Sequence, residues 1–129
     1  EHLGIAVKEL SQANRLFEAL LGAAPYKSEA VEREKVTTSF FRVGDSKIEL
    51  LEASDPQSPI AKFIEKRGEG IHHIAFEVED IAAAMARLRE LGFELLSDVP
   101  KEGADNKLIC FLHPRSTHGV LVELCQERR

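Results

Sequence analysis

An internal repeat constrains the fold of this chain more than any other feature of its sequence. Residues 2–7 read HLGIAV and residues 73–78 read HIAFEV, so adding 71 to each number in the first segment gives its counterpart. In both segments a large apolar residue stands at every second position, which is typical of a strand. The chain is therefore expected to contain two copies of one structural unit.

The repeat continues into an amphipathic helix in each copy. The apolar positions are spaced as i, i+3, i+7 and i+10, which predicts one buried stripe on each helix. In the first copy they are Leu10, Ala13, Phe17 and Leu20, and in the second copy Ile81, Ala84, Leu88 and Leu91. A glycine follows each stripe, Gly22 and then Gly92, and predicts the helix end.

The pattern returns near the end of each copy, where residues 48–50 (IEL) match residues 122–124 (VEL) at an offset of 74. Two further strands are predicted in each copy, at residues 25–31 and 36–43 and at residues 93–97 and 107–112. Each copy thus reads β-α-β-β-β, an α+β pattern with two tandem modules. Module 1 spans residues 1–52, and module 2 spans residues 71–129. Residues 53–70 form a connector with a short helix at about 58–66.

A chain of 129 residues suffices for one well-packed domain. Neither module is expected to fold alone, because so few strands with one helix bury too little apolar surface. We therefore expect one domain over residues 1–129.

Strand alternation sorts the polar residues by face. In the first strand His2 lies opposite the bulky Leu3, Ile5 and Val7, and in the second copy His73 lies opposite Ile74, Phe76 and Val78. The bulky face is expected to pack on the helix, which leaves each histidine on the other side of the sheet. Glu49 and Glu123 likewise lie opposite the apolar residues beside them.

A carboxylate in an otherwise apolar strand is costly to bury without a cation. Two imidazoles and two carboxylates at equivalent positions predict one divalent metal site, formed by His2, Glu49, His73 and Glu123. Any one of these residues alone would more simply be an ordinary strand residue. Their recurrence in the same residue type in both modules favours the metal site.

Other histidines and charges have simpler interpretations. His72 matches Glu1 rather than His2 and falls on the opposite strand face, so we expect a structural role for it. His113 and His118 flank a Pro-Arg-Ser-Thr turn and are expected in a loop. Residues 31–35 (VEREK) are expected to form a solvated turn.

Composition excludes several classes of function. The net charge is −5, and the absence of a basic stripe argues against a nucleic-acid partner. No apolar run approaches the roughly 20 residues of a bilayer span. Cys110 and Cys125 lie in apolar segments without metal-binding spacing, so we expect buried free thiols and a cytoplasmic location.

Paired β-α-β-β-β modules that open on His and close on a strand with Glu resemble the vicinal oxygen chelate superfamily. Within it the chain is similar to the methylmalonyl-CoA epimerases. Besides HLGIAV, the segments that carry the resemblance are VGDSKIELLE, SPIAKFIEKRGEGIHHIAFEV and FLHPRSTHGVLVEL. This resemblance implies a cup-shaped mixed sheet around the metal, a homodimer and an acyl-CoA substrate.

The reaction implied is interconversion of (R)- and (S)-methylmalonyl-CoA by proton removal and return through a metal-stabilised enolate. The metal ligands carry over onto His2, Glu49, His73 and Glu123, with Co²⁺ favoured on family grounds and Mn²⁺, Ni²⁺ or Zn²⁺ also compatible. Glu123 is our first candidate for the catalytic base and Glu49 the second. Some members carry a glutamate on the third strand that has been considered a catalytic base. Here that strand reads VTTSFF, and its polar residues are only Thr37, Thr38 and Ser39, which argues against a base on this strand.

Two alternatives belong to the same fold. A lyase of the glyoxalase I type would use the same four ligands on a glutathione hemithioacetal. A non-catalytic, resistance-type protein that binds a small molecule keeps the fold but can dispense with the ligands, and the presence of all four argues against it.

Overall fold

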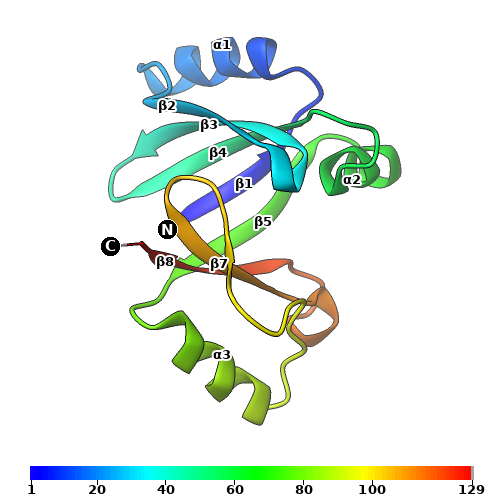
Figure 1. The fold of residues 1–129 in the computed structure, drawn as a ribbon. Coiled ribbons are helices and arrows are strands. Elements are labelled where there is room, and N and C mark those ends of the chain that lie inside the picture. Colours follow the sequence, from blue (N-terminus) through cyan, green and yellow to red (C-terminus); the bar gives the residue numbers. More distant parts are fainter. Residues whose placement is uncertain (129) are drawn as a thin grey trace. The chain divides into compact units, whose positions relative to one another are not determined.

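The computed structural model describes residues 1–128, which divide into two compact units (Figure 1). The first unit contains residues 2–72, and the second contains Glu1 and the chain from His73 onward. The division falls next to the predicted start of module 2 and leaves the predicted connector in the first unit. Both units have the predicted order of one strand, one helix and three strands.

The first unit builds a mixed sheet in the order β2-β3-β4-β1. Its elements are β1 (His2–Ala6), α1 (Leu10–Leu21), β2 (Lys27–Val31), β3 (Val36–Val43), β4 (Ser46–Ala53) and α2 (Pro59–Arg67). The first and last strands of the repeat, β1 and β4, pair in parallel, whereas β3 is antiparallel to both β2 and β4. A 3-10 turn, Glu32–Glu34, forms the predicted solvated turn between β2 and β3.

The second unit repeats this topology in the order β5-β8-β7-β6. Its elements are β5 (Gly70–Glu77), which starts in the first unit, α3 (Ile81–Glu90), β6 (Lys101–Glu102), β7 (Lys107–Leu112) and β8 (Val122–Glu127). The parallel pair is again the first and last strand, β5 with β8. The repeat read from the sequence is therefore a repeat of strand pairing as well.

Helix α1 covers one face of the first sheet (Figure 1). Its apolar side packs on β3 and β4 in a cluster with Val7, Leu10, Phe41 and Leu50 at its centre. The predicted stripe is wrong at its last position, because Leu20 is 69% exposed. At 100° per residue, i+10 points about 80° away from the first position, whereas i+11 returns to it. Leu21 therefore packs in the cluster instead.

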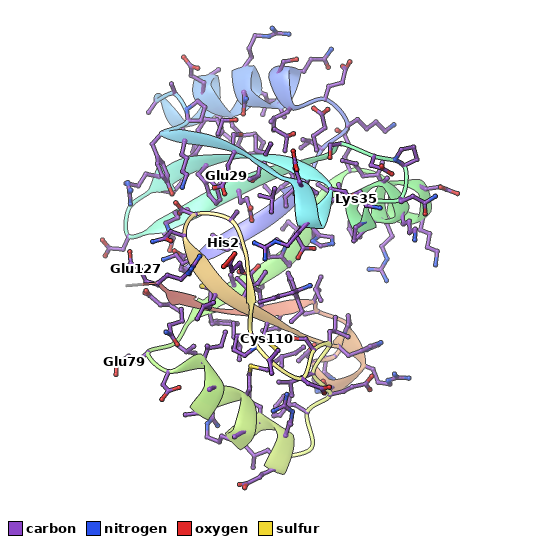
Figure 2. The ribbon with its side chains drawn as sticks, viewed as in Figure 1. His2, Glu29, Lys35, Glu79, Cys110 and Glu127 are labelled. Carbon is purple, nitrogen blue, oxygen red and sulfur yellow. The ribbon has the colours of Figure 1, made fainter. Side chains whose placement is uncertain are left out.

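Helix α3 packs on β7 and β8 through Ile81, Met85 and Leu88. Cys110, labelled in Figure 2, lies in the same cluster and projects from β7 toward the helix. Because α3 lies over β7 and β8, it leaves Phe76 on β5 54% exposed, which corrects the expectation that this side chain is covered by the helix. Leu91 is also exposed, since α3 ends at Glu90.

The predicted strand at residues 93–97 is wrong. Only Leu95 makes an isolated bridge, to Leu112, and the edge strand β6 begins later, at Lys101. The Arg89 guanidinium on α3 donates to the backbone oxygens of Ser97 (3.2 Å) and Asp98 (2.7 Å). These two carbonyls thus accept hydrogen bonds from a side chain of α3 instead of from the backbone of a neighbouring strand. Pro100 lacks an N–H for a ladder bond.

The two repeats also anchor their helices in the same way. The N–H of Leu10, the first residue of α1, donates to Glu52 Oε1 at 2.6 Å. The N–H of Ile81, the first residue of α3, donates to Gln126 Oε1 at 2.7 Å. Each acceptor lies three residues after the glutamate of its last strand. The last strand of each repeat therefore carries both the carboxylate and the anchor of the helix.

The predicted connector helix is present as α2, close to the expected bounds. Ser58 caps it by accepting a hydrogen bond from the Ile60 N–H at 3.1 Å, and Pro59 occupies its first turn. No helix among residues 1–128 is both long and apolar enough to cross a membrane.

Candidate metal and active site

The first unit holds a buried histidine-glutamate pair. His2, labelled in Figure 2, lies on β1, and Glu49 lies on the neighbouring β4, where it pairs in register with Gly4. His2 Nε2 is 3.2 Å from Glu49 Oε1, and both side chains are almost fully buried. The register partner of Glu49 is thus a residue without a side chain. The predicted faces of His2 and Glu49 are therefore borne out by their contact.

The second unit holds the equivalent pair. His73 on β5 and Glu123 on β8 place Nε2 and Oε1 3.3 Å apart, and both are buried. The register partner of Glu123 is Ala75, another small residue at the position equivalent to Gly4. The Phe111 ring packs edge-on to His73, with the ring centroids 5.7 Å apart. Pseudo-equivalent residues thus make the same contact in both units.

The geometry of each pair fits the binding of a divalent ion. Metal–nitrogen and metal–oxygen bonds of about 2.0–2.2 Å place neighbouring ligand atoms about 3 Å apart. The 3.2 Å and 3.3 Å separations lie close to this spacing. Each unit brings together one predicted imidazole ligand with one predicted carboxylate ligand. The donors are nitrogen and oxygen, which suit first-row divalent metals.

The remaining histidines lie where the sequence indicated. His72 packs edge-on against Phe63 of α2, with 5.0 Å between ring centroids, and so has a structural contact in the first unit. His113 precedes a 3-10 turn and its Nδ1 accepts the Arg115 N–H at 3.0 Å. His118 lies in the following loop with φ of 57°.

Both cysteines are free and fully buried, as predicted. Burial raises the pKa of the Cys125 thiol to about 12, and the charges of Glu1 and Glu123 add to this effect. Burial also raises the pKa of Cys110. Both thiols are therefore protonated at neutral pH, in keeping with a site built from nitrogen and oxygen ligands.

A surface ion pair accounts for one of the basic residues near the site segments. Arg115 donates to both carboxylate oxygens of Glu94, from Nε at 3.1 Å and from a terminal nitrogen at 3.0 Å. The Arg115 hydrogen bond lowers the pKa of the Glu94 carboxyl. This contact links the turn before β8 to the segment that follows α3.

One buried polar contact at the site was missed in the sequence. Thr38 on β3 donates from Oγ1 to Glu49 Oε2 at 2.9 Å, and its side chain is fully buried. The usable signal was strand alternation, which places Thr38 on the same face as Phe40, the register partner of Glu49. Strand alternation alone does not place Thr38 beside Glu49, because this also requires the pairing of β3 with β4.

The chain belongs to the glyoxalase/bleomycin resistance protein/dioxygenase superfamily, whose family model matches residues 1–111. Within that superfamily its similarity is to the methylmalonyl-CoA epimerases. It is 45% identical over 127 residues to the ethylmalonyl-CoA/methylmalonyl-CoA epimerase of Cereibacter sphaeroides, covering 97% of this chain and 95% of that protein.

Solved structures agree with the sequence comparison. The methylmalonyl-CoA epimerase of Mycobacterium tuberculosis matches with a TM-score of 0.95 and 34% identity, over 100% of this chain and 87% of that one. A variant of the Streptomyces coelicolor enzyme in complex with 2-nitronate-propionyl-CoA matches with a TM-score of 0.97 and 34% identity, over 100% and 96%. The predicted glyoxalase fold and the predicted resemblance to this group are both confirmed.

Proposed function

We propose that this chain is a metal-dependent epimerase that interconverts (R)- and (S)-methylmalonyl-CoA. The observation that carries the proposal is the same buried His–Glu pair in each repeat, His2 with Glu49 and His73 with Glu123. The relatives with this activity in their names support the choice of reaction, since their similarity extends over nearly the whole chain.

We assign all four side chains as ligands of one divalent ion. Burying a carboxylate is costly unless a cation or hydrogen bonds compensate, and Glu49 and Glu123 are each only 5% exposed. When bound, the ion supplies a Lewis acid that stabilises negative charge developing on the substrate. Cobalt is the metal we favour, on the grounds of family resemblance, and two imidazoles with two carboxylates also suit manganese, nickel or zinc.

The carboxylates of the chain are assigned the proton transfers. The acidic carbon of methylmalonyl-CoA lies between a thioester and a carboxylate, and epimerisation removes its proton on one face and returns one on the other. A general base and a general acid are needed, and each repeat contributes one buried glutamate. We assign Glu123 as the first candidate for this role and Glu49 as the second.

The reaction is tested by proton exchange in deuterated solvent. Metal-loaded protein should catalyse the incorporation of deuterium into methylmalonyl-CoA at the carbon between the thioester and the carboxylate. Mass spectrometry of the substrate measures this incorporation. Glu123→Gln should retain the metal and lose most of the exchange. Exchange at the wild-type rate in this variant would remove Glu123 as the base, and absence of exchange in the wild type would refute the epimerase function.

The metal site has its own test in two adjacent histidines. His73→Ala should lose bound metal in elemental analysis of the purified protein. His72→Ala is the matched control, because His72 packs on Phe63 instead of facing Glu123, and it should retain the metal. Equal metal content in the two variants would contradict the assignment of His73 as a ligand.

The proposal also includes a cytoplasmic homodimer that takes an acyl-CoA substrate. Free buried thiols support a reducing compartment. The complexes of the related epimerases with methylmalonyl-CoA and with 2-nitronate-propionyl-CoA support the acyl-CoA substrate. Sedimentation equilibrium of the purified protein tests the dimer, and a monomer at all concentrations would refute it.

A further inference from the structure

Thr38 lies beside the Glu49 carboxylate because of the register between β3 and β4. Phe40 is the register partner of Glu49, and Thr38 is the partner of Leu51. Partners across a strand pair share a face, and residues two apart on one strand share it too. Thr38 is thus the diagonal neighbour of Glu49, within reach of its carboxylate.

The two oxygens of this carboxylate contact two different strands. Oε1 lies 3.2 Å from His2 Nε2 on β1, and Oε2 accepts the Thr38 hydroxyl hydrogen bond at 2.9 Å from β3. Thr38 is fully buried, where a hydroxyl is expected to be hydrogen-bonded. Contacts at both oxygens restrict rotation of the carboxylate about its last bond. The strand pairing therefore sets the orientation of Glu49.

The second repeat has a different residue at this place. Phe111 pairs with Glu123 as Phe40 pairs with Glu49, so the equivalent of Thr38 is Ile109. Ile109 is buried in an apolar cluster with Ala75 and Cys125, and its side chain cannot donate a hydrogen bond to Glu123. The proposed ligands are therefore equivalent in the two repeats, but the residues at the Thr38 and Ile109 positions are not.

We infer that Thr38 is a positioning residue that orients Glu49 for metal binding, an inference that rests on the proposed function. A hydrogen bond to a metal-binding side chain from a residue that does not itself bind the metal typically contributes 10- to 100-fold to metal affinity or activity. Thr38 holds Glu49 in the ligand orientation. The hydroxyl of Thr38 distinguishes this position from the equivalent position of Ile109 in the second repeat.

Metal affinity without substrate tests the inference. Apo protein is titrated with Co²⁺, followed by its visible absorption, for the wild type, Thr38→Val and Thr38→Ser. Valine keeps the shape of threonine but removes the hydroxyl, so Thr38→Val should weaken Co²⁺ binding by about 10-fold or more and alter the spectrum of the bound ion. Thr38→Ser keeps the hydroxyl, so it should retain the wild-type affinity for Co²⁺ and the wild-type spectrum. Ile109→Val is the matched control in the other repeat and should leave both unchanged.

The outcomes separate this inference from the proposed function. Wild-type affinity and spectrum in Thr38→Val would overturn the positioning role, even if the protein is an epimerase. Weakened binding in Thr38→Val without rescue by Thr38→Ser would also overturn it, because a general loss of packing would then explain the result. A wild type that binds Co²⁺ but fails to exchange the substrate proton would refute the function, while the titrations still decide the role of Thr38.

Discussion

Replacing Glu52 with alanine should destabilise the protein by about 1–2 kcal/mol. Its carboxylate accepts the first N–H of α1, from Leu10, at 2.6 Å. The residue before the helix, Glu9, makes no side-chain cap, and the first turn holds no acidic residue. A hydrogen bond to a charged group contributes about 1.5–3 kcal/mol, and an anion at a helix N-terminus about 0.3–1 kcal/mol. Glu52 is only partly buried, and screening by solvent reduces this sum to about 1–2 kcal/mol.

The second repeat offers an internal comparison. Gln126 accepts the Ile81 N–H at 2.7 Å with a neutral amide oxygen. The Asp80 side chain also caps this helix by accepting the Ala83 N–H at 3.0 Å, and it remains when Gln126 is removed. Gln126→Ala should therefore cost only about 0.5–1 kcal/mol, the usual contribution of a neutral hydrogen bond.

Urea unfolding followed by circular dichroism measures both costs. Glu52→Ala should also lower Tm by about 3–6 °C for a chain of this size. Glu52→Gln retains an acceptor without the charge and should fall between the wild type and Glu52→Ala. Added salt should shrink the cost of Glu52→Ala but not that of Gln126→Ala.

The exposed residue Glu18 on the same helix provides a control. Glu18→Ala should change stability by no more than about 0.5 kcal/mol, as is usual for surface positions. If Glu52→Ala costs as little as Glu18→Ala, or no more than Gln126→Ala, the argument that the last strand anchors α1 electrostatically is refuted.

Three further predictions concern packing, backbone and thiol chemistry. Met85→Ala should cost about 2–5 kcal/mol in urea unfolding, because the side chain is 1% exposed in the α3 core. Gly22 ends α1 with φ of 78°, a left-handed conformation that is costly for a residue with a Cβ atom. Gly22→Ala should therefore lower the free energy of unfolding by about 1–2 kcal/mol, and an unchanged free energy of unfolding would contradict this reasoning. Burial raises the pKa of Cys110, so its thiol should react with a disulfide reagent at pH 8 only after unfolding. Its contribution to stability should be complete below the ordinary thiol pKa of about 8.5 and decline as pH rises past it, which unfolding at pH 7 to 10 measures.

Strand alternation and helix periodicity predicted most of the elements, because each depends on a local pattern of apolar residues. The same reasoning failed where a distant contact decided the outcome. Residues 93–97 form only an isolated bridge to Leu112, and beyond it Arg89 from α3 binds the carbonyls of Ser97 and Asp98. Phe76 is exposed because α3 lies over β7 and β8. No local pattern contains these contacts.

The sequence by itself determined the repeat and selected the two His–Glu pairs, because side-chain direction in a strand follows from backbone geometry alone. It also separated His73 from His72 in this way. Only the tertiary structure decided which residues support the glutamates. Thr38 and Ile109 stand at equivalent positions, yet the contact of Thr38 with Glu49 depends on the register of β3 against β4. Register arises from the pairing of separate strands, so the residues that distinguish the two halves of the site appear only in the folded chain.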